Sequence, residues 1–290
     1  MIYLVLSILA NTAIYLLFKW YGNLRVRILD AIVFNYLTAA TIGILVITDW
    51  STTFGTALQA PPWVIAATML GAVFISVFYL MSLTTQKVGV SVATIASKMS
   101  LVIAALIFVW LGKEQMNGLG YMALLFAFLS VFLVSYRNVG KVTLVKMLFW
   151  PLLILVGSTA IDFVIAYFAD QPSNADERAL YSCLSFITAG TIGILLLTAR
   201  YFVKGILPSR RDILAGVLLG TVNYGSIYFL VESYHANLLS TAQTLQVNNL
   251  AVVVLGAFAA RLIFKESWSK VNLLGIALGI IALSILICSH

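Results

Sequence analysis

The chain has 290 residues, of which 62% are hydrophobic and only 9% are charged, and its formal net charge is +7. A water-soluble domain cannot bury so large an apolar fraction, so the composition excludes a soluble protein and indicates one that lies in lipid. The positive charge does not indicate a nucleic-acid partner, because Lys and Arg fall in short gaps between apolar runs. Cys183 and Cys288 both lie inside such runs, so no disulfide framework, metal or other cofactor is predicted.

Taken in chain order, the apolar runs predict ten transmembrane helices, since about 20 mostly apolar residues are needed to cross the hydrocarbon core. The first run, which starts at Ile2, lacks a basic head and a small-residue cleavage site and is expected to be a retained helix. All five prolines are expected at run edges, where a helix begins or ends. The ten runs are centred near Leu9, Ala40, Ala72, Leu101, Phe128, Leu155, Ala189, Thr221, Val252 and Leu278. The predicted fold class is all-α integral membrane.

The loop charges predict the orientation of these helices, because cytoplasmic loops carry an excess of Lys and Arg. One set of loops has only Lys113 and Arg178. We therefore expect a multi-pass protein of the cell inner (plasma) membrane, with both termini on the non-cytoplasmic side. The opposite, cytoplasmic set contains Lys19, Arg25, Arg27, Lys87, Arg137, Lys141, Lys146, Arg200, Lys204, Arg210, Arg211, Arg261, Lys265 and Lys270.

An internal repeat accounts for the number of helices. The string TAATIGIL at 38–45 recurs as TAGTIGIL at 188–195, which gives a period of about 150 residues. Gly112-Lys113-Glu114, at the end of the fourth run, likewise matches Phe264-Lys265-Glu266 at the end of the ninth. We predict two five-helix repeats, residues 1–140 and 141–290. An odd number of crossings inserts the second repeat from the other side, so the two repeats are inverted.

With this repeat, the chain resembles the drug/metabolite transporter superfamily, specifically its ten-helix EamA-type branch. The resemblance covers nearly the whole length and rests on the five-plus-five organisation, the matched ends of the fourth and ninth runs, and the small-residue helices Ala123-x3-Ala127 and Gly275-x3-Gly279. The chain departs from the family in having Met99 and Ala251 where a proline is common, and in its predicted termini. The first run also resembles the small multidrug resistance proteins. Those carry a glutamate where this chain has Asn11, which argues against a multidrug cation exchanger.

Lys98 is the main candidate for binding substrate. It lies about eight residues into the fourth run, and a charge at mid-membrane costs about 2.5 to 3.5 kcal/mol unless it has a partner or a purpose. The alternative is that its long side chain reaches back to the interface. The resemblance implies a central cavity between the fourth and ninth helices, in which Lys98 would bind a carboxylate or phosphate. The ninth run contributes polar candidates that could equally link helices: Gln243, Gln246 and Asn249.

Asp162, inside the sixth run, is the candidate for proton coupling. A carboxyl within the membrane can take up and release a proton as its surroundings alternate, and the alternative is a structural ion pair with Lys98. Asn11 and Tyr228 are weaker candidates for contact with substrate. Glu232 and His235, near the end of the eighth run, are expected at the interface. A structural role is expected for Glu114 and Glu266.

The sequence therefore predicts a secondary transporter, expected to be an exporter, of small polar metabolites such as amino acids, working by alternating access. One alternative is an exchanger of organic anions or phosphorylated sugars, and another is a non-transporting receptor or scaffold. An enzyme is not predicted, because the only histidines are His235 and His290 and no zinc motif or paired intramembrane aspartates occur. The expected partners are a small-molecule metabolite, the lipid bilayer and protons, but no nucleic acid. The chain is expected to be a monomer or a homodimer.

Overall fold

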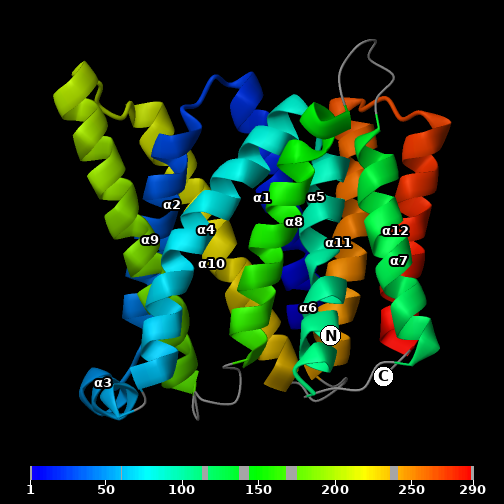
Figure 1. Ribbon diagram of the computed structural model, residues 1–290. Coiled ribbons are helices and arrows are strands. Elements are labelled where there is room, and N and C mark those ends of the chain that lie inside the picture. Colours follow the sequence, from blue (N-terminus) through cyan, green and yellow to red (C-terminus); the bar gives the residue numbers. More distant parts are fainter. Residues whose placement is uncertain are drawn as a thin grey trace. The chain divides into compact units, whose positions relative to one another are not determined.

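The computed structural model describes residues 2–59, 61–112, 117–136, 144–167, 175–235 and 241–288, and the regular elements in these ranges are all α-helices (Figure 1). In chain order these are α1 (Ile2–Asn23), α2 (Ile28–Val46), α3 (Trp50–Leu58), α4 (Pro61–Lys87), α5 (Val90–Lys98), α6 (Ser100–Trp110), α7 (Gly118–Ser135), α8 (Leu144–Tyr167), α9 (Ala175–Lys204), α10 (Arg210–His235), α11 (Thr241–Phe264) and α12 (Lys270–Cys288).

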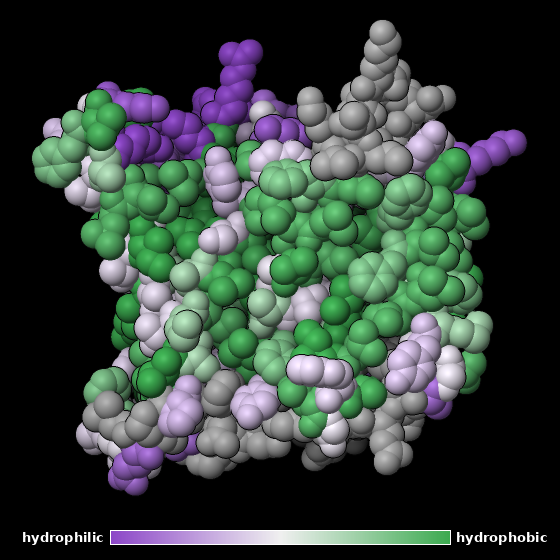
Figure 2. All heavy atoms as spheres, in the orientation of Figure 1, coloured by the Kyte–Doolittle hydropathy of each residue, from purple (hydrophilic) through white to green (hydrophobic). Residues whose placement is uncertain are grey.

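These helices are those of a multi-pass membrane protein. Within the described residues, nine helical segments are long and apolar enough to cross a membrane, and the described part of α12 is a shorter apolar helix. On the face drawn in Figure 2, hydrophobic side chains cover the middle of the helices, and hydrophilic ones gather near helix ends. The chain is thus an all-α membrane protein. The number of ten spans and the repeat organisation stay predictions.

Proline marks the start of helices with one exception. Pro61 is the first residue of α4 and Pro208 precedes α10, positions at which the missing N–H leaves no helical bond unmade. Pro172 lies outside the described residues. Pro151, however, lies inside α8. The prediction that every proline lies at a helix edge is wrong there, because α8 already begins at Leu144, seven residues before Pro151.

The contacts divide the chain into two compact units, each made of segments that are distant in sequence. The first unit contains residues 1–19, 80–163 and 226–290, and the second contains residues 20–79 and 164–225. Helices α1, α4, α8 and α10 contribute to both units. Both units combine residues from before and after position 140, and the most extensive helix contact in each, α7 with α12 and α2 with α9, joins opposite halves of the sequence.

In the first unit, α7 and α12 lie side by side (Figure 1). A Cβ atom at Gly275 would come within 2.5 Å of the Val134 backbone nitrogen, so only glycine permits this approach. The hydroxyl of Ser130 donates a hydrogen bond to the Gly275 carbonyl at 2.7 Å. On α7, Ala123 and Ala127 are buried. The Gly275-x3-Gly279 motif of α12 therefore lies in close contact with Ser130, Leu133 and Val134 of α7.

In the second unit, α2 and α9 lie side by side (Figure 1) and share a buried ion pair. The Asp30 side chain is fully buried and accepts two hydrogen bonds from the Arg200 guanidinium, at 2.5 and 2.9 Å. Arg27 lies 3.4 Å from the same carboxylate. This two-point geometry suits an arginine, whose donors form a planar fork. In the sequence, Arg200 is only one of the loop charges that predict orientation. In the structure it also neutralises a buried aspartate.

Candidate functional site

The fourth span is interrupted where the sequence is most polar. Helix α5 ends at Lys98 and α6 begins at Ser100. Between them, the fully buried Met99 keeps helical dihedral angles, with φ −72° and ψ −14°. The Val102 N–H donates to the Met99 carbonyl at 3.2 Å, which is the tighter i to i−3 pattern of a 3₁₀ turn. The interruption occurs without a proline and places Lys98 and Ser100 on either side of a tightened turn.

The start of α5 is held by the loop that follows α11. The Glu266 carboxylate accepts hydrogen bonds from the Val90 N–H at 2.7 Å and from the Ser91 hydroxyl at 3.1 Å. A carboxylate at this position satisfies free N–H groups and interacts favourably with the positive end of the helix dipole. Glu266 thus fixes the position of α5 relative to α11. Its predicted counterpart, Glu114, lies outside the described residues.

Asp162, on α8, lies against the interrupted turn. Its Oδ2 atom is 2.5 Å from the Ser100 hydroxyl oxygen, and that hydroxyl also contacts the Ser97 carbonyl. A serine hydroxyl has a single proton to donate. Both contacts are satisfied together when Asp162 is protonated, because it then donates to Ser100 while Ser100 donates to Ser97. The arrangement can therefore hold a proton on the carboxyl. When that proton leaves, Ser100 can donate to only one of its two partners, and one hydrogen bond is lost.

Lys98 and Asp162 are neighbours that do not pair directly. Both side chains are half-buried, and their charges interact electrostatically. No ion pair within 4.0 Å joins them, although both belong to the described residues. A cation and a carboxyl kept apart inside a membrane span each retain the capacity to bind something else.

A serine pair links α5 to α8 beside these two charges. The hydroxyls of Ser97 and Ser158 lie 3.2 Å apart and share a hydrogen bond. Tyr15 of α1, whose side chain is fully buried, hydrogen-bonds Ser97. The charged centre therefore brings together residues of α1, α5, α6 and α8.

A second polar network in the same unit contains no charge. The Ser7 hydroxyl of α1 contacts the Asn248 side-chain oxygen at 3.2 Å and the Ser226 carbonyl at 2.9 Å. The Asn11 amide donates to the Ser7 carbonyl at 3.2 Å. Buried amides and hydroxyls of this kind join helices at modest strength. This amide network links α1 to α10 and α11.

The two networks are related by one numerical shift. The serine of the amide network, residue 7, and that of the charged centre, residue 158, differ by 151. Their partners, residues 97 and 248, also differ by 151. The same shift takes Asn11 to Asp162 and Lys98 to Asn249. Each charged residue of one network thus corresponds to an asparagine in the sequence of the other half.

The remaining predicted site residues have different surroundings. Gln246 and Asn249, on α11, are both buried, with side chains 4% exposed. The Gln246 Oε1 atom has no hydrogen-bond partner among the residues that the structure describes. Gln243 is part of α11, but its side chain lies outside the described residues. Tyr228 is 40% exposed and packs edge-on against Phe229, so it is not part of the buried centre.

Sequence reasoning missed the hydroxyl groups that hold the charged centre. Ser97, Ser100, Ser158 and Tyr15 gave no separate signal, because serine and tyrosine are common packing residues in membrane helices. Position could have found one of them: Ser158 lies four residues before Asp162, one helical turn away on the same face.

The described residues contain no group of three or more His, Cys, Asp or Glu side chains that could hold a metal ion. The Cys183 thiol is buried and contacts the Ala40 carbonyl at 3.7 Å. The Cys288 side chain lies outside the described residues. The chemistry of the centre thus rests on a carboxyl, an ammonium and neutral hydrogen-bonding groups.

Comparison with known proteins supports the fold and leaves the activity open. No family model matches the chain. It is 25% identical over 296 residues to an uncharacterized protein of Haemophilus influenzae, a match that covers 99% of this chain and 97% of that protein. A crystal structure of another protein superposes with a TM-score of 0.58 at 14% identity, covering 98% of this chain and 95% of that one. The structural likeness concerns the fold alone.

Proposed function

We propose that the protein is a secondary transporter, acting as an exporter of small polar metabolites such as amino acids, with its binding site between the fourth and ninth predicted spans. The observation that carries the proposal is the pair Lys98 and Asp162, half-buried in membrane helices and not directly paired. Charges that served structure alone would gain most from direct contact. Kept apart, they are available to a substrate and a proton.

Lys98 supplies the anion-binding group in this proposal. It ends α5 beside the tightened turn, and α5 packs against α11, which carries the buried amides. An ammonium donates charge-assisted hydrogen bonds to a carboxylate. The unpartnered Oε1 atom of Gln246 could accept a hydrogen bond from the ammonium group of an amino acid. Together these groups suit a small molecule with both charges.

Asp162 carries the coupling proton in this proposal. When protonated it satisfies both Ser100 contacts, and when ionised it leaves Lys98 as the nearest compensating charge. Proton release would therefore strengthen the attraction between Asp162 and Lys98 and compete with an anion bound at Lys98. Such competition between proton and substrate states is what coupled exchange requires.

The shared shift of 151 residues supports the inverted-repeat part of the proposal. Inverted repeats can exchange conformations and open one central site to either side in turn. The EamA-type resemblance remains a prediction of the sequence, as does a non-enzymatic role. Exchange of organic anions or phosphorylated sugars is the second candidate function, because Lys98 would bind a phosphate as readily as a carboxylate.

The test is transport in proteoliposomes, with labelled amino acids and organic anions measured separately and with or without a pH gradient. We expect Asp162→Asn to retain exchange but to lose accumulation driven by the gradient. We expect Lys98→Ala to lose exchange itself. Matched controls remove an exposed charge of the same sign, in Asp49→Asn and Lys204→Ala, and should behave as wild type.

Two outcomes would contradict the proposal. Unchanged exchange and accumulation in both variants would return Lys98 and Asp162 to a structural role. No flux of any tested solute in the folded wild-type protein, together with saturable binding of a ligand, would favour a receptor. The class of solute that moves distinguishes export of amino acids from anion exchange.

A further inference from the structure

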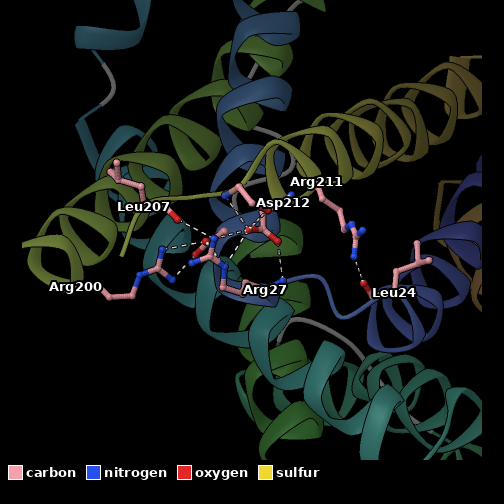
Figure 3. Close-up of polar contacts among 8 residues, drawn as sticks. Leu24, Arg27, Arg200, Leu207, Arg211 and Asp212 are labelled. Atoms are coloured by element: carbon pink, nitrogen blue, oxygen red, sulfur yellow. Dashed lines mark hydrogen bonds and ion pairs between the residues drawn. The ribbon is translucent and has the colours of Figure 1, made fainter. Parts of the chain in front are cut away.

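The second unit contains an open hollow that the proposed transport site does not use. Its volume is about 530 Å³, and it is lined by Arg25, Arg27, Ser209, Arg210, Arg211 and Asp212. These residues come from the loop before α2 and from the loop and first turn of α10. Figure 3 labels Arg27, Arg211 and Asp212 among them. Each loop connects two helices that are apolar and long enough to cross a membrane. The hollow therefore lies at the polar boundary of the spans, the depth of lipid headgroups.

Internal contacts neutralise only part of its charge. Asp212 accepts hydrogen bonds from the Arg27 side chain at 3.0 Å and from the Ser209 hydroxyl at 2.6 Å, so its carboxylate is fully engaged. Arg27 is thereby paired. Arg211 donates to the Leu24 carbonyl at 3.0 Å, a neutral acceptor that leaves its charge uncompensated (Figure 3).

Arg25 and Arg210 complete the excess of positive charge. Both are exposed, and neither has an acidic partner among the described residues. With Arg211, three guanidinium groups around the hollow lack a counter-charge. Solvent-exposed like charges that gather around one hollow repel one another, and an anion between them would remove that repulsion.

The backbone adds to this positive field. Helices α2 and α10 both begin at the hollow, and the N-terminus of a helix carries the positive end of its dipole. Each of these first turns also carries an aspartate, Asp30 in α2 and Asp212 in α10, and both pair with Arg27, the N-terminal cap of α2. Arg210 opens α10 and has no such partner among the described residues. Arg25 has φ 53° because it closes the C-terminus of α1: its N–H donates to the Gly22 carbonyl at 3.2 Å, and the Val26 N–H donates to the Tyr21 carbonyl at 3.0 Å. The excess of positive charge around the hollow therefore comes from Arg25, Arg210 and Arg211.

Topology alone does not explain why the cations around the hollow are all arginines. The charge bias of cytoplasmic loops requires only that Lys or Arg be present, at any position in the loop. Here every cation that lines the hollow is an arginine, whose planar fork matches two oxygens of a phosphate group. Basic pockets beside membrane helices on the cytoplasmic side, where the sequence predicts these loops, are suited to acidic headgroups.

We propose that this hollow binds the phosphate group of an anionic phospholipid. Arg25, Arg210 and Arg211 would contact the phosphate oxygens, while Asp212 holds Arg27 and Ser209 as the fixed wall of the site. The inference is independent of transport, since no residue of the charged centre takes part.

The experiment measures thermal unfolding in a neutral detergent during titration with short-chain phosphatidylglycerol. Short-chain phosphatidylcholine, which is zwitterionic, and inorganic phosphate are titrated in parallel. The test variant is Arg25→Gln/Arg210→Gln, which removes two charges without breaking a described hydrogen bond. The control is Lys265→Gln/Lys270→Gln, which removes one cation from the loop after α11 and one from the start of α12 and leaves the hollow intact.

We expect phosphatidylglycerol to raise the unfolding temperature of the wild type and of the control. In the test variant, the half-saturating concentration should increase at least tenfold. Equal unfolding temperatures of all three proteins without lipid would show that the variant folds. An equal response of the test variant and the wild type to phosphatidylglycerol would overturn the proposal. Stabilisation by inorganic phosphate as strong as that by phosphatidylglycerol would overturn the lipid assignment and leave a site for free phosphate.

Discussion

Each unit places an acid and a base inside the membrane helices, but the two pairs differ in geometry. In the second unit, Asp30 and Arg200 are joined by two hydrogen bonds. In the first unit, Lys98 and Asp162 interact without direct contact, and the Asp162 carboxyl bonds a serine instead. The contrast teaches that burial of a charge does not by itself indicate function. A directly paired charge holds helices together, whereas a charge that binds a neutral neighbour remains free to exchange partners.

Breaking the paired charges should have the largest effect on stability. Arg200→Ala leaves the fully buried Asp30 carboxylate with only the more distant Arg27, so we expect a loss of about 3 kcal/mol in the free energy of unfolding. The measurement is unfolding in detergent. Arg200→Ala/Asp30→Asn should recover much of the loss, because no unpaired charge remains. A loss below about 1 kcal/mol in the single variant would show that the pair is solvated like a surface ion pair.

Removing the unpaired cation should change binding more than stability. Lys98→Asn places at position 98 the residue found at 249 and should raise the half-saturating concentration for exchange of an amino acid by about tenfold or more, since a charge-assisted hydrogen bond contributes about 1.5 to 3 kcal/mol. Lys98→Arg retains the charge and should lie between Lys98→Asn and wild type. Unfolding in detergent should change little, because no direct ion pair is lost. A stability loss as large as that of Arg200→Ala would remove the distinction between the two pairs.

The two related serine contacts sharpen the comparison within the first unit. Ser158→Ala removes one hydroxyl contact between helices and Ser7→Ala removes two, and we expect each lost contact to destabilise the protein by about 0.6 kcal/mol. Only Ser158→Ala should also alter the pH dependence of transport, because Ser158 lies beside the charged centre. Equal pH profiles for both variants would show that the serine pair does not influence Asp162.

The smallest effect concerns an exposed carboxylate outside the spans. The Thr48 hydroxyl donates to Asp176 at 2.7 Å and lowers the pKa of that carboxyl below its ordinary value of 3.8. A lowered pKa in the folded state contributes stability above pH 3.8, which is lost as the pH falls through the folded pKa. Thr48→Val should therefore reduce stability slightly above pH 3.8 and have less effect at more acid pH. Unfolding temperatures on both sides of that pH provide the measurement. A difference that grows on acidification would contradict this sign.

Local sequence predicted several features of the candidate site. A cation at residue 98 and a carboxylate at residue 162 stand out in any apolar run, because a charge there is costly. The amide-rich start of α11 was found in the same way. The tightened turn at Met99 could not be predicted, since methionine favours a helix and no proline or glycine marks the position. Hydrogen bonds from Ser100 to the backbone and to α8 accompany the interruption.

The sequence by itself determined that this chain is an all-helical membrane protein and which of its loops are basic, because hydropathy and loop charge are sums over neighbouring residues. Only the tertiary structure decided which charges meet. Arg200 and Asp30 pair across 170 residues, while Lys98 and Asp162, both visible in the sequence, remain apart. It likewise gathered Arg25, Arg210 and Arg211 from two loops around one hollow. Such contacts depend on how helices pack, and a side chain's distant neighbours leave no trace in its local pattern.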